Sequence, residues 1–137
     1  MTQQAKGRFE MKSWDENVYQ EMEGGRKLTR ASVTNAFSGD IEGESTLEYL
    51  MAYSDEETAY FVGLEHIEGK IGDRKGSFVL QQTGTYEDAT VKASWFVVPG
   101  SGTGELAGLK GEGGFVWAGH EEKSTAYILD YELYERN

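Results

Sequence analysis

The sequence predicts an all-β protein, a closed barrel of eight antiparallel strands connected in sequential order. Apolar and polar residues alternate with a period of two along most of the chain, and clusters of Gly, Asp, Glu and Ser separate the alternating segments. No stretch with a helical period is longer than a turn or two. Short, evenly spaced strands with tight links are typical of an antiparallel meander. Eight strands can close around side chains or one small ligand, and closure removes exposed edges, so a barrel is favoured over an open sandwich.

Four strands are predicted in the first half of the chain. The segment from Phe9 to Trp14 alternates, whereas the acidic, irregular segment from Asp15 to Lys27 is expected to be a loop with at most a helical turn. The next strands run from Leu28 to Phe37 and from Glu44 to Tyr53, because each places large apolar side chains on one face. After a polar hairpin turn, the strand from Ala59 to Ile67 is apolar on both faces over most of its length.

Four more strands follow in the second half. The strand from Ser77 to Thr85 comes after a turn region with several glycines, and the strand from Val91 to Val98 alternates. Beyond a glycine-rich stretch lie the last two strands, from Phe115 to Gly119 and from Thr125 to Tyr134. No linker or internal repeat is visible, so residues 1–137 are expected to form a single domain.

The glycine-rich stretch is the most unusual part of the sequence. Seven of the fifteen residues from Gly100 to Gly114 are glycine, and the only proline of the chain, Pro99, precedes them. The segment from Gly102 to Ala107 fits the GxGxxA pattern of a dinucleotide loop, but the glycines that follow would break the helix that such a loop requires. A Walker loop is excluded because Gly111 stands where Ser or Thr should follow Lys110. The stretch therefore predicts a structural turn.

Composition excludes several classes of function. Twenty-four Asp and Glu residues against thirteen Lys and Arg residues give a formal net charge of −11, which disfavours nucleic acids and anionic lipid as partners. Cysteine is absent, which excludes disulfides and thiolate chemistry. No apolar run approaches the ~20 residues of a membrane-spanning helix. We expect a soluble cytoplasmic protein that contacts neither membrane nor nucleic acid.

Motifs for metal, cofactor or hydrolytic chemistry are also lacking. His66 and His120 are the only histidines, and their spacing matches no ligand motif. No Gly-x-Ser-x-Gly elbow is present, which argues against a serine hydrolase. Glu105, within the glycine-rich stretch, is expected to accept hydrogen bonds from backbone amides. We therefore predict no metal site and no cofactor.

The parity of the strands predicts which polar and aromatic side chains face the barrel interior. They are Asn35, Tyr49, Tyr53, Glu65, Gln82, Trp95, Trp117, Tyr127 and Tyr131. Aromatic walls with a few polar groups are typical of a small-molecule site, although eight-stranded barrels also fill with such side chains. The prediction is a barrel that binds one small apolar or aromatic molecule. The candidate ligand-binding residues are Asn35, Tyr49, Tyr53, Gln82, Trp95, Trp117 and Tyr127.

An isomerase or cyclase is the alternative, because such an enzyme needs a dry cavity and one acidic group rather than an elaborate motif. Its candidate catalytic residues are Glu65 and Tyr131. If Glu65 points inward, desolvation should raise its pKa and suit it to proton transfer. The other interpretation, a partly exposed carboxylate at the end of a strand, is favoured.

Apolar residues on the outer side of two strands predict self-association. In the strand from Ala59 to Ile67, the outer face is expected to carry Tyr60, Val62 and Leu64. In the strand from Val91 to Val98, Phe96 and Val98 are expected to point outward. An outward apolar patch usually marks an interface. We expect a homo-oligomer, with a two-fold dimer favoured by symmetry.

Several spaced motifs resemble a family of small bacterial proteins catalogued as a domain of unknown function. The motifs run from Gly100 to Gly111, Gly39 to Glu44, Glu48 to Met51, Val62 to Glu65 and Gly76 to Gln81. The likeness covers nearly the whole chain. That family is similar to the allene oxide cyclase barrels of plants and, more loosely, to the dirigent proteins, which share a Gly-x-Gly-like turn before their penultimate strands.

The resemblance implies an eight-stranded barrel and makes a trimer, as in the plant cyclases, the alternative to a dimer. The segment from Thr85 to Asp88 also resembles a cyclase segment. The family leads us to expect histidine at position 82, where this chain has Gln82. No residue here aligns with the catalytic acid of the cyclases, so the resemblance does not imply their activity.

Overall fold

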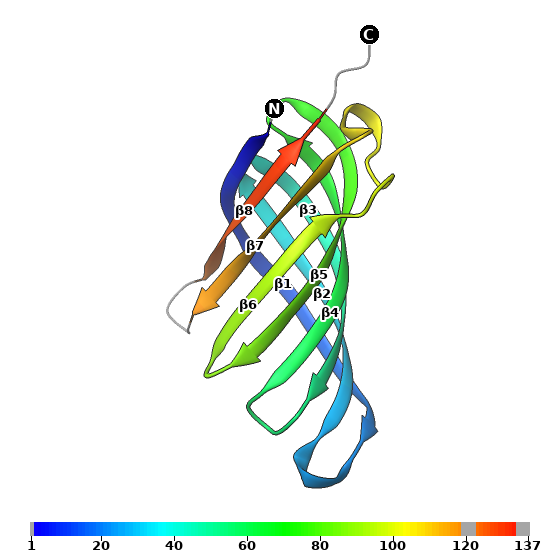
Figure 1. Cartoon of the computed structure of the whole chain (residues 1–137), viewed down its shortest axis with the longest axis vertical. Coiled ribbons are helices and arrows are strands. Elements are labelled where there is room, and N and C mark those ends of the chain that lie inside the picture. Colours follow the sequence, from blue (N-terminus) through cyan, green and yellow to red (C-terminus); the bar gives the residue numbers. More distant parts are fainter. Residues whose placement is uncertain (1, 119–122, 134–137) are drawn as a thin grey trace.

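The computed structural model describes residues 2–118 and 123–133, which form eight strands closed into one barrel (Figure 1). The strands are β1 (Gln3–Glu21), β2 (Lys27–Gly39), β3 (Ile41–Tyr53), β4 (Ala59–Ile71), β5 (Arg74–Glu87), β6 (Thr90–Val97), β7 (Lys110–Ala118) and β8 (Ser124–Glu132). Each pairs antiparallel with the next in sequence, and β8 pairs with β1, so the predicted closed antiparallel meander is confirmed. The predicted ends of the last two strands, Gly119 and Tyr134, lie outside the described residues. Within the described residues, no helix is long and apolar enough to cross a membrane.

The segment from Asp15 to Lys27 was predicted to be a loop, but its residues up to Glu21 belong to strand β1. For those residues the prediction was wrong. Residues 13–18 pair with residues 29–34 of β2. A short 3-10 helix, η1 (Glu23–Gly25), then provides the helical turn. Register shifts at Lys12 and Tyr19 each add a residue to β1. Such a bulge reverses the inward and outward order of the side chains beyond it, which is why this segment looks irregular in the sequence.

Residues 98–109 form the structural turn that the glycine-rich stretch predicts, with a short 3-10 helix, η2 (Gly104–Leu106). Gly100, Gly104 and Gly108 have φ values of 83°, 59° and 86°, in the left-handed region that favours glycine. The Glu105 carboxylate accepts a hydrogen bond from the backbone N–H of Lys75 at 3.1 Å, as predicted.

Strand β7 begins at Lys110 rather than at the predicted Phe115, so the last glycines of the stretch belong to a strand. They allow close approach of the neighbouring backbones. A Cβ atom added to Gly114 would lie 2.2 Å from the carbonyl oxygen of Ala93 on β6. A substitution there must push the two strands apart.

The two ends of the barrel differ (Figure 1). The upper end of the figure holds the start of β1, the end of β8 and the glycine-rich turn, and the lower end holds η1 and the β3–β4 and β5–β6 turns. Strand β1 has 19 residues, β2, β3 and β4 have 13 each, and β5 has 14, but β6 has 8 and β7 and β8 have 9 each. Strands β6–β8 form a short wall, and the lower ends of the strands step down from β8 to β1, so that β1 and β2 extend furthest at the lower end.

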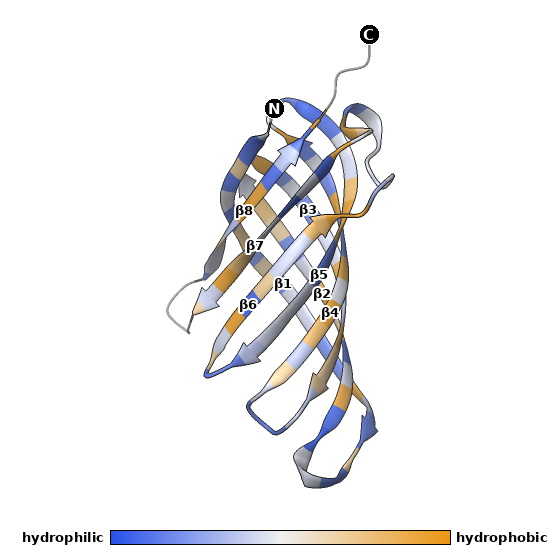
Figure 2. Cartoon of the chain, in the orientation of Figure 1, coloured by the Kyte–Doolittle hydropathy of each residue, from blue (hydrophilic) through white to orange (hydrophobic). Residues whose placement is uncertain are grey.

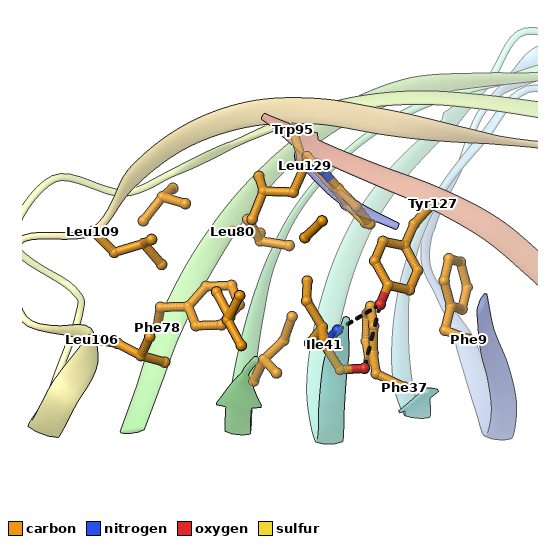
Figure 3. Packing of buried hydrophobic residues seen from close by; sticks show 14 residues of the cluster. Phe9, Phe37, Ile41, Phe78, Leu80, Trp95, Leu106, Leu109, Tyr127 and Leu129 are labelled. Carbon is orange, nitrogen blue, oxygen red and sulfur yellow. Dashed lines mark hydrogen bonds between the residues drawn. The ribbon is translucent and has the colours of Figure 1, made fainter. Parts of the chain in front are cut away.

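A hydrophobic cluster fills the upper part of the barrel (Figure 3), and hydrophobic and hydrophilic residues alternate along the strands as predicted (Figure 2). The cluster consists of Ala5, Phe9, Phe37, Ile41, Ile67, Ile71, Phe78, Leu80, Trp95, Val97, Leu106, Leu109, Tyr127 and Leu129. The Tyr127 hydroxyl accepts a hydrogen bond from the Ile41 N–H at 2.9 Å and donates one to the Ser38 carbonyl at 3.0 Å. The indole N–H of Trp95 donates to the Ile128 carbonyl at 3.1 Å. These bonds join β8 to β6 and to the β2–β3 turn.

Candidate functional site

A buried polar layer separates the upper cluster from a second hydrophobic cluster below it. The second cluster consists of Ala31, Val33, Leu47, Tyr49, Met51, Ala59 and Phe61. On β2, β3, β4 and β5 respectively, Asn35, Ser45, Glu65 and Gln82 are the buried polar residues at this level. Glu65 is only 1% exposed and lies in the middle of its strand. The interpretation of Glu65 as a partly exposed carboxylate at a strand end was therefore wrong.

The Glu65 carboxylate accepts three hydrogen bonds from neutral donors. Asn35 Nδ2 and Ser45 Oγ donate to its Oε2 atom at 3.0 and 2.6 Å, and Gln82 Nε2 donates to its Oε1 atom at 2.7 Å. The Tyr49 hydroxyl in turn donates to Gln82 Oε1 at 2.7 Å. In the described part of the chain, no buried side-chain nitrogen or oxygen lacks a partner. Four of the sequence-predicted inward residues therefore form one connected network.

Burial raises the pKa of the Glu65 carboxyl above its ordinary value. The hydrogen bonds from Ser45, Asn35 and Gln82 lower the pKa and oppose part of this effect. Desolvation, together with the nearby carboxylate, also raises the pKa of the Tyr49 phenol. Among the described residues, no Lys or Arg forms an ion pair with Glu65. The acid is thus poised to hold a proton, but its side chain offers almost no surface to a substrate.

The other predicted site residues of the upper half lie apart from this network. Trp95 and Tyr127 are packed within the upper cluster. Tyr131 lies at the upper end, where its hydroxyl donates to Gln3 Oε1 at 2.8 Å beside a hollow of about 130 Å³. The structure therefore does not bring Tyr131 together with Glu65.

A second polar group lies nearer the lower end, around Glu16. Its Oε2 atom accepts hydrogen bonds from Thr29 Oγ1 at 2.7 Å and from the Tyr53 hydroxyl at 2.8 Å, and its Oε1 atom accepts one from the Trp14 indole N–H at 3.1 Å. Burial and the hydrogen bond to Glu16 raise the pKa of the Tyr53 phenol. The ammonium group of Lys27 lies 4.7 Å from the centre of the Tyr53 ring.

Three apolar side chains of β1 face the barrel interior and yet remain exposed. Met11, Trp14 and Val18 pair directly with buried residues of β2, and directly paired residues point to the same side of a sheet. Their exposed fractions are nonetheless 53%, 42% and 45%. Inward-facing apolar residues in a closed barrel would normally be covered, so this part of the interior is open.

The unequal strand lengths explain the opening. Within the described residues, β8 pairs with β1 only between Gln3 and Glu10, so the rest of β1 has only β2 beside it. We call this region the open inner face. It consists of Met11, Trp14, Glu16, Val18 and Tyr53, together with the buried ring of Tyr49 that packs against Trp14.

The aromatic rings of the open inner face continue into the second cluster. The ring centres of Trp14 and Tyr49 are 6.0 Å apart, and those of Tyr49 and Phe61 are 4.8 Å apart. On the short wall, the half-buried Trp117 is paired with Val91, which packs against the second cluster. Of the predicted site residues, Tyr49 and Tyr53 therefore belong to this region, and Trp117 lies on the short wall beside the second cluster.

Sequence reasoning missed all four residues that β1 contributes to the open inner face. Met11 was placed on a strand but not among the site residues, and Trp14 ended that strand. Glu16 and Val18 fell in the segment expected to be a loop. The spacing of Met11, Trp14, Glu16 and Val18 is the signal that could have found them, since one shift of parity after Met11 restores a period of two.

The outer surface carries the exposed apolar residues that the sequence predicts. Tyr60, Val62 and Leu64 on β4 and Phe96 on β6 are all exposed. Val98 lies just beyond the end of β6 and is half-buried.

The described residues contain no group of three or more His, Cys, Asp or Glu side chains that could hold a metal ion. His66 is exposed on β4, and His120 lies outside the described residues.

Comparison with known proteins identifies relatives over nearly the whole chain. A family model described as a protein of unknown function (DUF3224) matches residues 5–131. The crystal structure of a DUF3224 protein of unknown function from Shewanella oneidensis MR-1 is similar, with a TM-score of 0.82 and 31% sequence identity over 99% of this chain and 100% of that chain. A search of curated proteins finds no match.

Proposed function

The chain belongs to the DUF3224 family, and we propose that it binds one small aromatic or apolar molecule on the open inner face of its barrel. The exposure of Met11, Trp14 and Val18, which face the interior, carries this proposal. Small-molecule sites are typically lined by apolar and aromatic side chains with a few well-placed polar groups. The open inner face has this composition, with Glu16 as its polar group.

The predicted site residues take different parts in this proposal. Tyr53 supplies aromatic surface to the ligand, the buried Tyr49 ring supports Trp14 from behind, and Trp117 lies on the short wall. Asn35 and Gln82 lie deeper in the barrel, in the polar layer above the site, where they hold Tyr49 in place through the Glu65 network. Trp95 and Tyr127 support the upper core and do not touch the ligand.

Tryptophan fluorescence tests the proposal. The three tryptophans are Trp14, Trp95 and Trp117, and only Trp14 belongs to the open inner face. A panel of small aromatic and aliphatic compounds should include some that change the emission saturably, and Trp14→Phe should remove most of that change. Trp95→Phe is the matched control, and it should leave the response in place. If no compound in the panel gives a saturable response, the proposal fails.

An isomerase or cyclase that uses Glu65 is the second candidate function. The favourable observation is the buried acid with a raised pKa, connected through Gln82 to the Tyr49 phenol. Binding is preferred because Glu65 is 1% exposed and already accepts three hydrogen bonds. Glu65→Gln separates the two functions, since a binder keeps its ligand, whereas an enzyme keeps binding but loses turnover. Unchanged turnover in this variant would remove Glu65 from the mechanism.

We also propose that the outer apolar residues form a homodimer interface. Leu50 pairs directly with Val62 on the outer surface, and Tyr60, Leu64 and Phe96 extend this apolar area across β3–β6. Light scattering at micromolar concentration should give twice the 15.3 kDa mass of one chain, and Val62→Lys should return the mass to that of a monomer. A wild-type monomer that persists on concentration contradicts the dimer, and a mass of three chains supports the trimer instead.

A further inference from the structure

We propose that the ligand of the open inner face is an organic cation, a protonated amine carried on an aromatic or aliphatic body, and that Glu16 binds its ammonium group. This inference rests on the proposed function and specifies the chemistry of the same site. It follows from three features of the lower half of the barrel: the free acceptor capacity of Glu16, the aromatic rings beside it and the charge of the surrounding turns.

The first feature is the bonding of the Glu16 carboxylate. Thr29, Tyr53 and Trp14 all donate to it, and none of these donors carries a charge. A carboxylate offers about four acceptor positions. Two are taken on Oε2 and one on Oε1, so Oε1 can still accept a hydrogen bond. Among the described residues no cation forms an ion pair with Glu16, and the side chain is only half-buried. Its negative charge is therefore oriented by the protein and left available to a ligand.

The second feature is the aromatic character of the surroundings. Trp14 and Tyr53 contact Glu16 directly, and the Tyr49 ring lies next to Trp14. Aromatic faces attract ammonium groups, and the attraction is strongest where water is partly excluded. The protein already uses this attraction, because the Lys27 ammonium group lies 4.7 Å from the centre of the Tyr53 ring. An amine bound at Glu16 would extend this pattern to the neighbouring rings.

The third feature is the charge of the turns at the lower end. The β3–β4 turn carries Asp55, Glu56 and Glu57, and Glu87 and Asp88 lie at the β5–β6 turn, five acids with no basic residue beside them in these turns; in the β1–β2 connection the charges of Glu23 and Arg26 cancel. All five side chains are exposed. A field of this sign attracts cations and repels anions, and salt weakens it. A carboxylate or phosphate ligand would have to approach against it.

Three probes that share one aromatic body test the charge of the ligand by isothermal titration calorimetry. They are 1-naphthylmethylamine, 1-naphthalenemethanol and 1-naphthoate, which are cationic, neutral and anionic at neutral pH. We expect the amine to bind about tenfold more tightly than the alcohol, because one charge-assisted hydrogen bond supplies a difference of this size. The anion should bind most weakly, and added salt should reduce the preference for the amine.

Variants of the chain assign the preference to Glu16. Glu16→Gln keeps the size of the side chain and should bring the amine to the affinity of the alcohol, and an unchanged midpoint in urea denaturation shows that the variant is still folded. Glu56→Gln makes the same change in charge on a nearby turn and should alter amine affinity less than twofold. Lys27→Met removes the cation next to Tyr53 and should tighten amine binding several-fold.

The outcomes separate this inference from the function on which it rests. Equal affinity of wild type for amine and alcohol, or a preference for the anion, overturns the cation proposal and leaves the binding function standing. An amine preference that survives in Glu16→Gln also overturns it. If none of the three probes binds while other members of the fluorescence panel do, the cation proposal fails alone, and if nothing binds, both fail.

Discussion

Replacing Glu65 with glutamine should change how the stability of this protein depends on pH. Burial raises the pKa of Glu65 in the folded protein, whereas in the unfolded chain the carboxyl has its ordinary pKa of about 4.3. Glutamine does not titrate and has almost the same size. Comparison of the two proteins therefore isolates the protonation of one buried group from that of all other acids.

The sign and size of the effect follow from proton linkage. Above about pH 4.3 the unfolded chain has lost the proton, but the folded protein keeps it up to its raised pKa. In this interval the folded state binds one proton more, so the free energy of unfolding of wild type falls by about 1.4 kcal/mol for each pH unit relative to the variant. The contribution of protonated Glu65 is complete below about pH 4.3 and is lost as pH rises through the folded pKa.

The substitution also shifts stability by an amount that does not depend on pH. The amide oxygen of the new glutamine can accept the hydrogen bonds from Asn35 and Ser45. Its NH₂ group, however, faces the NH₂ group of Gln82, so the Gln82 amide must rotate by 180° to present its oxygen instead. That offset raises or lowers the whole curve without changing its slope. Glu65→Leu, by contrast, leaves three buried donors without an acceptor and should cost about 3 kcal/mol or more.

Urea denaturation, followed by tryptophan fluorescence from about pH 4 to about pH 8, measures the effect. The difference in unfolding free energy between Glu65→Gln and wild type should rise with pH and then level off at the folded pKa. Glu56→Gln, on an exposed turn, should show no comparable rise. A difference that stays constant over this range would show that Glu65 is ionised in the folded protein and would refute the argument from desolvation.

Two further predictions concern the fold. Tyr127→Phe removes the hydroxyl that accepts the hydrogen bond from the Ile41 N–H. In urea denaturation this change should lower the free energy of unfolding by about 1 to 3 kcal/mol. An unchanged urea midpoint would mean that water replaces the hydroxyl. Gly114→Ala places a Cβ atom 2.2 Å from the Ala93 carbonyl oxygen and should lower the melting temperature. Gly100→Ala is the control, because its added Cβ atom meets no atom within 4 Å and only the left-handed φ is strained. An equal loss of melting temperature in Gly114→Ala and Gly100→Ala would contradict the packing argument.

The sequence was sufficient to predict the architecture because most strands keep their alternation along their length. Strands β2, β3 and β4 extend the predicted segments without changing their parity. Strand β1 was only partly predicted, because its bulges at Lys12 and Tyr19 interrupt the period of two. The start of β7 was missed because glycines that permit close strand approach have the same appearance in a sequence as glycines in a turn.

The site was less predictable than the fold because it depends on register. Parity correctly placed Asn35, Tyr49, Glu65 and Gln82 inside the barrel. Their assembly into one network depends on which residues lie at the same height on neighbouring strands, and the partners of Glu65 are 17, 20 and 30 residues away in sequence. The open inner face depends in addition on the length of β8 relative to β1, the strand with which it pairs, and no local pattern encodes that difference.

A crystal structure of the protein grown with 1-naphthylmethylamine tests the central claim most directly. The account predicts electron density for the naphthalene ring against Trp14 and Tyr53 on the open inner face, with the amine nitrogen within hydrogen-bonding distance of Glu16 Oε1. Density for the ring elsewhere with the open inner face unoccupied, whether at the Tyr131 hollow of the upper end or on the outer surface around Val62, would contradict it.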